Sequence, residues 1–139
     1  MKPLQFAGAD DLRAVLTCSL LSGRPAVLDD IRPRLSDAEV AFVDLLAKLA
    51  PGTRAVVSAD GSKLDFTPGP VEGGQITQKM PTERSLGWYL EYLLVILPFG
   101  KLVSRITLEG ATHSNGDLSV DALETLADHV RYFAKSDEF

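Results

Sequence analysis

The sequence predicts an α+β fold built from tandem βαβαββ units, of which the second is incomplete. Two observations support this prediction. Short apolar strands alternate with amphipathic helices along the 139 residues, and the order of elements repeats after a break at Pro68-Gly69-Pro70. The first unit is expected at residues 1–69, and the second, at residues 70–139, lacks a closing hairpin. A split β-α-β arrangement with helices on one sheet face suits each unit.

The first unit opens with a strand and a helix. Leu4–Ala7 is short and alternates in polarity, as a strand does. Asp10 or Asp11 is placed to cap a helix that runs to about Leu21. A second short strand is then expected to begin at Ala26.

The rest of the first unit contains a capping box and a hairpin. Ser36 precedes Glu39 by three residues, so each side chain can bond the backbone amide of the other at the start of a helix. The runs Arg54–Ser58 and Lys63–Thr67 then flank Asp60-Gly61. An Asp-Gly pair between two such runs predicts a β-hairpin.

The second unit repeats the strand–helix–strand–helix order. Its helix around the run Leu93–Leu97 is apolar almost all round, and its last helix is capped by Ser119. The expected elements are a strand at 75–78, a helix at 83–97, a strand at 102–109 and a helix at 120–135. With no hairpin after residue 139, this unit is expected to leave a sheet edge or apolar surface for something else to cover.

Composition excludes several classes of protein. The longest apolar run, Leu93–Leu97, is far shorter than the roughly 20 residues of a membrane span, so no membrane partner is expected. The single cysteine rules out an internal disulfide and a cysteine-rich zinc site. Fourteen basic and nineteen acidic residues give a net charge of −5, so any RNA contact must come from a local basic patch.

Four arginines are candidates for such a phosphate-facing patch. They lie on the first predicted helix and around the second strand: Arg13, Arg24, Arg32 and Arg34. Three aspartates share the segment and oppose the field of the arginines: Asp29, Asp30 and Asp37. A contact to RNA or phosphate and an ordinary solvated set of charges are both consistent with this pattern.

An aromatic cluster on the apolar helix of the second unit is the other candidate. Trp88, Tyr89 and Tyr92 sit among leucines, with Glu91 as the one charge. A helix of this kind is either buried in the core or meets a partner. The sequence leaves both readings open. No catalytic, cofactor-binding or metal-binding residue is identified.

Motifs along nearly the whole chain resemble one known family. The most specific stretch is Arg84-Ser85-Leu86-Gly87-Trp88-Tyr89-Leu90-Glu91, which continues to Leu97-Pro98-Phe99-Gly100-Lys101. Leu21-Ser22-Gly23-Arg24-Pro25 and Leu35-Ser36-Asp37-Ala38-Glu39 add to it. In these motifs the sequence resembles the RNA 3′-terminal phosphate cyclase superfamily, and within it the non-catalytic, cyclase-like branch of ribosome biogenesis.

The resemblance implies a fold and a cellular role. It implies tandem βαβαββ units, similar to those of the C-terminal domain of translation initiation factor three and of enolpyruvyl transferases. It implies action in small-subunit ribosome biogenesis and pre-rRNA processing, within the nucleolus of the nucleus. The implied partners are a ribosome-assembly GTPase and other components of the pre-ribosomal particle (the small-subunit processome), through which pre-rRNA is reached. Because members of the family are longer, the chain is expected to be an N-terminal portion.

Enzymatic activity is the open question. True cyclases convert an RNA 3′-phosphate to a 2′,3′-cyclic phosphate through adenylate carried on a histidine in their C-terminal part. Their Gly-Gly-Gly-Gln turn before the first helix is Gly8-Ala9-Asp10-Asp11 here, which puts carboxylates where phosphate would bind. The sequence therefore favours a non-catalytic protein without a cofactor. The alternative is a fragment of an active ATP-dependent RNA 3′-terminal phosphate cyclase.

Overall fold

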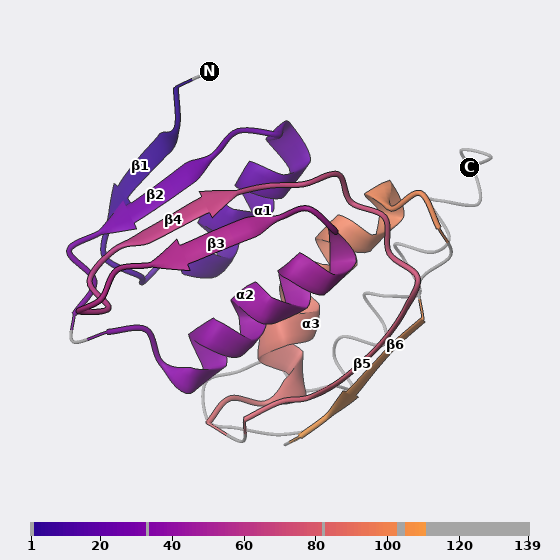
Figure 1. The fold of residues 1–139 in the computed structure, drawn as a ribbon. Coiled ribbons are helices and arrows are strands. Elements are labelled where there is room, and N and C mark those ends of the chain that lie inside the picture. Colours follow the sequence, from indigo (N-terminus) through magenta and orange to yellow (C-terminus); the bar gives the residue numbers. More distant parts are fainter. Residues whose placement is uncertain (1, 33, 82, 103–104, 111–139) are drawn as a thin grey trace.

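The described part of the chain contains three α-helices, a short 3₁₀ helix and six strands, which form two sheets and one helical layer (Figure 1). The computed structural model describes residues 2–32, 34–81, 83–102 and 105–110, and the helix predicted at 120–135 lies outside them. The strands are β1 (Leu4–Ala7), β2 (Ala26–Asp29), β3 (Arg54–Val57), β4 (Leu64–Thr67), β5 (Gln75–Lys79) and β6 (Arg105–Glu109). The helices are α1 (Leu12–Ser22), α2 (Asp37–Leu49), α3 (Leu86–Ile96) and the 3₁₀ turn η1 (Leu97–Phe99).

The strands divide between a four-stranded and a two-stranded sheet. The first has the order β1-β2-β4-β3, with β1 and β2 parallel and the β3–β4 hairpin antiparallel, as the Asp-Gly signal predicted. The second pairs β5 with β6 in parallel, from Gln75 opposite Arg105 to Lys79 opposite Glu109. The α+β prediction is confirmed, and each sheet falls in one predicted unit. The unit boundary at residue 69 stays a prediction.

The predicted N-terminal cap is present at α2, whereas the cap expected at α1 is not formed by a side chain. At α2, the Glu39 amide donates to the Ser36 hydroxyl at 3.2 Å, and the Ser36 amide donates to the Glu39 carboxylate at 2.9 Å, so the predicted capping box is present. At α1, Asp11 is the N-cap residue, but its side chain accepts no capping hydrogen bond. Its backbone, at φ −104° and ψ 22°, is not in the extended region that side-chain capping normally uses.

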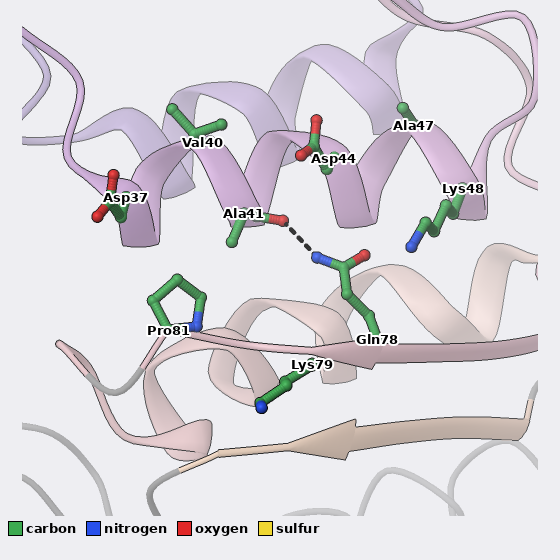
Figure 2. Close-up of a pocket in the computed structure, with 9 residues that line it drawn as sticks. All are labelled: Asp37, Val40, Ala41, Asp44, Ala47, Lys48, Gln78, Lys79 and Pro81. Carbon is green, nitrogen blue, oxygen red and sulfur yellow. Dashed lines mark hydrogen bonds between the residues drawn. The ribbon is translucent and has the colours of Figure 1, made fainter.

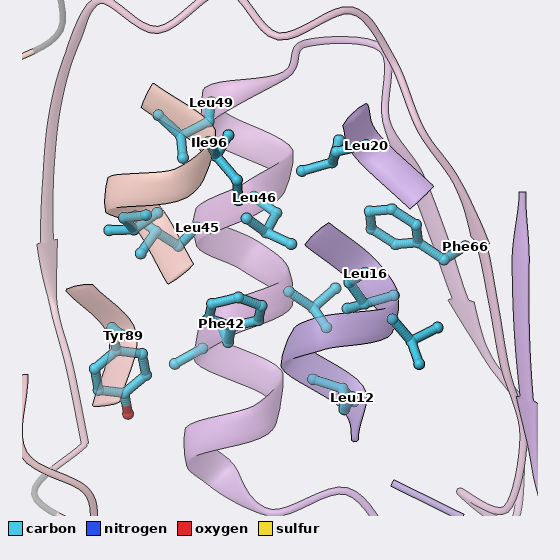
Figure 3. Close-up of a cluster of buried hydrophobic side chains, with 14 of the residues drawn as sticks. Leu12, Leu16, Leu20, Phe42, Leu45, Leu46, Leu49, Phe66, Tyr89 and Ile96 are labelled. Atoms are coloured by element: carbon cyan, nitrogen blue, oxygen red, sulfur yellow. The ribbon is translucent and has the colours of Figure 1, made fainter. Parts of the chain in front are cut away.

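The three helices share one hydrophobic core (Figure 3). Four side chains of α2 are fully buried at its centre: Phe42, Leu45, Leu46 and Leu49. Figure 3 shows Leu12 and Leu16 of α1 on one side of them and Tyr89 of α3 on the other. The two predicted units therefore bury their apolar surface together. Among the described residues, no helix is long and apolar enough to cross a membrane.

The segment between the two sheets is fixed to the end of α2. The Leu49 carbonyl accepts hydrogen bonds from the amides of Glu72 at 2.9 Å and Gly73 at 3.0 Å, which satisfies a carbonyl left over at the helix terminus. A Cβ atom on Gly69 would lie 2.6 Å from the Pro51 carbonyl oxygen, so only glycine allows this close approach. The predicted break at Pro68-Gly69-Pro70 is thus an ordered connection.

The tip of the β3–β4 hairpin is organised around one carboxylate. Asp60 Oδ1 accepts from the Ser58 hydroxyl at 2.7 Å, the Ser62 hydroxyl at 2.8 Å and the Ser62 amide at 3.1 Å. These hydrogen bonds, that from Ser58 first, lower the pKa of Asp60 from 3.8 to about 2. Gly61 follows with φ +76°, a conformation that favours glycine.

Replacing Ser36 tests the capping box. Ser36→Ala removes the acceptor for the Glu39 amide and is expected to lower the free energy of unfolding by about 1 kcal/mol, measured by urea denaturation. Ser22→Ala is the matched control, because the Ser22 hydroxyl makes only two long contacts, donating to the Ser19 carbonyl at 3.5 Å and accepting from the Arg24 amide at 3.3 Å. Equal stability of the two variants would contradict the assignment.

The hairpin tip should respond to acid. Because the pKa of Asp60 is lower in the folded chain, its stabilisation is complete above pH 3.8 and is lost as the pH falls through about 2. The Ser58→Ala/Ser62→Ala variant should return the Asp60 pKa towards 3.8, measured by NMR titration of the side-chain carboxyl carbon. An unchanged pKa in that variant would show that the hydroxyls are not the cause.

Candidate functional site

The N-terminal ends of three helices meet around one cavity of about 440 Å³. Helix N-termini carry positive partial charge, and such convergence favours an anion. The cavity also holds charged side chains of both signs. Its lining residues are Ala9, Asp10, Leu12, Arg13, Ser36, Glu39, Glu83, Arg84 and Trp88. Of the four candidate arginines, only Arg13 lies here.

Arg13 is held against α3 through its Nη1 atom and its guanidinium face. Its Nη1 donates to the Trp88 carbonyl at 2.8 Å and to Glu91 Oε2 at 2.9 Å. Its guanidinium carbon lies 4.6 Å from the centroid of the Trp88 ring and 4.8 Å from that of Tyr92, within the range of cation–π attraction. The side chain is 24% exposed, so these contacts form in a partly desolvated setting.

The remaining charges do not suit a phosphate group. With Arg13 neutralised by Glu91, the cavity presents Arg84 against the carboxylates of Asp10, Glu39 and Glu83. A nucleotide phosphate placed here would meet more negative than positive charge. The residues that line this cavity therefore do not fit a nucleotide phosphate.

Two of the three aromatic residues considered as a partner surface belong to the core instead. Trp88 is 7% exposed and Tyr89 is fully buried, while Tyr92 is partly buried beside Arg13. The Trp88 ring packs edge-on against Phe42 of α2, with centroids 5.9 Å apart, because α3 closes over the α1–α2 layer. This is the buried alternative that the sequence left open.

The other three arginines are dispersed. Arg24 follows α1 and donates to the Lys2 carbonyl, at the end of β2 opposite to Arg32. Arg32 forms an exposed 2.8 Å ion pair with Asp30, and Arg34 lies next to Gly61 of the hairpin. The four arginines therefore form no continuous patch, and their contact with RNA stays a prediction.

A second, shallower cavity of about 630 Å³ lies between α2 and β5 (Figure 2). The Gln78 side chain spans it and donates to the Ala41 carbonyl at 3.2 Å, which ties β5 to α2. Gln78 Oε1 is buried without a hydrogen-bond partner among the described residues. Asp37, Asp44 and Lys48 edge the cavity, but no group of three metal-ligating side chains occurs in the described part of the chain.

Comparison with known proteins identifies the family. The family model described as RNA 3′-terminal phosphate cyclase matches residues 4–133. The chain belongs to the RNA 3′-terminal phosphate cyclase family. The resemblance read from the motifs around Gly87 and Ser36 is confirmed.

Several relatives are named as cyclase-like or rRNA processing proteins. The chain is 39% identical over 129 residues to the human RNA 3′-terminal phosphate cyclase-like protein, covering 89% of this chain and 35% of the relative. It is 36% identical over 126 residues to a probable cyclase-like protein of Caenorhabditis elegans, covering 87% and 33%. It is 34% identical over 126 residues to the rRNA processing protein rcl1 of Schizosaccharomyces pombe, covering 87% and 35%. The chain thus spans about a third of the length of these relatives.

Glu91 is the site residue that sequence reasoning missed as a partner of Arg13. Each residue was visible in the sequence, but 78 positions separate them, and no local pattern links them. The nearest signal was that Glu91 is the one charge in an apolar helix. A partly buried charge on an otherwise apolar helix favours a partner of opposite sign.

Substitutions at Arg13 and Glu91 test this contact. Arg13→Ala is expected to cost about 2–3 kcal/mol of unfolding free energy, because it removes a charged hydrogen bond to a carbonyl and two ring contacts. Glu91→Gln keeps the shape and should cost only about 0.5–1 kcal/mol, since the pair is partly exposed. Urea denaturation at two salt concentrations measures both.

The double variant supplies the control for this experiment. In Arg13→Ala/Glu91→Gln the losses should be less than additive, because both changes act on one contact. Strict additivity would show that the two side chains do not interact in solution.

Proposed function

We propose that this chain is part of a cyclase-like protein that acts in ribosome small-subunit biogenesis and pre-rRNA processing, without cyclase activity of its own. The observation that carries the proposal is the match of nearly 90% of the chain to cyclase-like and rRNA processing proteins. The yeast relative from Saccharomyces cerevisiae, 30% identical over 124 residues, is likewise named an rRNA processing protein.

The charge arrangement at the helix N-termini supports a non-catalytic role. A phosphate-binding cavity needs donors and cations that are free to meet the ligand. Here Arg13 is held by Glu91 and the Trp88 carbonyl, and the other charged residues of the lining are Arg84 and three carboxylates. The polar residues of this cavity are therefore better suited to holding the helices together than to binding a nucleotide.

The second candidate is a fragment of an active ATP-dependent RNA 3′-terminal phosphate cyclase. The match to the RNA 3′-terminal phosphate cyclase family model favours it. The two candidates differ in whether the parent protein forms a covalent adenylate.

The proposal extends to partners and location. We propose a ribosome-assembly GTPase as the direct partner, with pre-rRNA reached through it, and residence in the nucleolus. Depletion of the full-length protein should cause uncleaved early pre-rRNA to accumulate, as seen by Northern blotting, and should be rescued by the intact gene. Unchanged pre-rRNA after verified depletion would contradict the proposal.

The first functional prediction concerns ATP. Incubation of the full-length protein, and of this chain, with α-labelled ATP is expected to leave no covalent label, because the cavity charge opposes phosphate. An active cyclase of the family is the positive control. Label retained after denaturation would overturn the non-catalytic proposal and favour the second candidate.

The second functional prediction concerns RNA. Arg32 and Arg34 are exposed and lie close in sequence, but Asp30 pairs with Arg32, and the chain carries a net charge of −5. Binding to a short pre-rRNA fragment should therefore be negligible and unchanged by Arg32→Ala/Arg34→Ala. If the two arginines do bind phosphate, the double change should instead lower the log–log salt slope by about 1.5–2. Titration at two salt concentrations separates these outcomes.

A further inference from the structure

Asp60-Gly61 is the single Asp-Gly pair of the sequence, and Asp60 is exposed at the hairpin tip. Such a pair is chemically reactive. The Gly61 amide nitrogen can attack the Asp60 side-chain carbon Cγ, forming an N–Cγ bond while a carboxyl oxygen leaves as water. The resulting succinimide takes up one water at either carbonyl and gives aspartate or isoaspartate. No oxidant or cofactor is required, and glycine offers no Cβ to obstruct the attack.

The hairpin geometry blocks both reacting groups. The Gly61 amide donates to the Ser58 carbonyl at 2.9 Å, so its nitrogen is committed to the turn. The Asp60 carboxylate is fixed by the hydroxyls of Ser58 and Ser62 and by the Ser62 amide, all on Oδ1. Attack requires the side chain to leave all three donors and turn towards its own main chain.

The protonation state adds to this restraint. Succinimide formation proceeds from the protonated carboxyl group, because its OH group leaves as water, whereas an ionised carboxylate has no such leaving group. Lowering the pKa of Asp60 from 3.8 to about 2 reduces the protonated fraction at neutral pH by about 60-fold. The neighbouring charged residues Arg34 and Lys63 form no ion pair with Asp60 within the described structure.

We propose that Asp60 is an isoaspartate-forming modification site that the Ser58 and Ser62 hydroxyls hold dormant while the hairpin is folded. Succinimide formation can proceed when the hairpin tip opens and these hydrogen bonds break. The modified linkage adds one carbon to the main chain between β3 and β4, at a tip whose Ser62 carbonyl accepts from the Ile31 amide at 2.9 Å. The modification would therefore disturb the Val57–Leu64 register and the adjoining end of β2.

The experiment ages the purified chain at neutral pH and physiological temperature. All variants carry Asn115→Gln, because an Asn-Gly pair can also form isoaspartate, by deamidation, and Asn115-Gly116 lies outside the described residues. The test variant is Ser58→Ala/Ser62→Ala, and Ser58→Thr/Ser62→Thr keeps the hydroxyl donors. Ser22→Ala is the matched control away from the hairpin. A synthetic peptide of residues 54–67 gives the unrestrained rate.

Mass spectrometry and isoaspartyl methyltransferase labelling read out the product. Trypsin cleaves after Arg54 and Lys63, which isolates Asp60-Gly61 in one peptide. Isoaspartate should form in the parent chain at least about tenfold more slowly than in the peptide, because the protonated fraction of Asp60 alone is lower by more than that factor. The alanine variant should approach the peptide rate, and the threonine and Ser22 variants should stay near the parent rate.

Two results would overturn the proposal. One is equal rates in the parent chain and the peptide, which does not depend on any variant folding. The other is a parent-like rate in the alanine variant. Amide exchange at α2 is measured alongside, so that a faster rate counts as support only where the core of the variant remains as protected as that of the parent chain.

Discussion

The guanidinium of Arg13 joins α1 to α3, and the arrangement of the second unit depends on that contact. Arg13 contacts the rings of Trp88 and Tyr92 and donates hydrogen bonds to a carbonyl and a carboxylate of α3. The position of α3 in turn places Trp88 edge-on against Phe42, in the core around α2. A cation at the start of one helix thus orients the apolar face of another helix 75 residues further along.

Local patterns predicted the elements well, since each pattern depends on neighbours in sequence. The Ser36–Glu39 capping box needs only a spacing of three, and the Asp60-Gly61 hairpin needs only a turn between two strand-like runs. The alternating order of strands and helices gave the α+β class and the two sheets for the same reason. The first residues of helices were predicted less accurately, because α3 begins at Leu86 and not at the expected Glu83.

The candidate site could not be derived in this way, because its geometry is set by contacts between distant segments. Sequence proximity grouped Arg24 with Arg32, yet β2 separates them in space. Sequence also could not decide between core and surface for Trp88 and Tyr89. That choice depends on which faces of α3 meet α1 and α2, and both faces are apolar. Only packing distinguishes equivalent apolar faces of one helix.

The same packing determines the chemistry of the cavity. Three helix N-termini and two arginines would together attract an anion, but the contact that fixes α3 consumes one of those cations. Releasing Arg13 to meet a ligand would require breaking its bonds to Glu91 and to the Trp88 carbonyl, and would expose the rings it covers. Stability of the helix layer and affinity for phosphate therefore oppose each other at Arg13. In this chain the balance lies with stability, because Glu91 supplies inside the protein the negative charge that a ligand would otherwise bring.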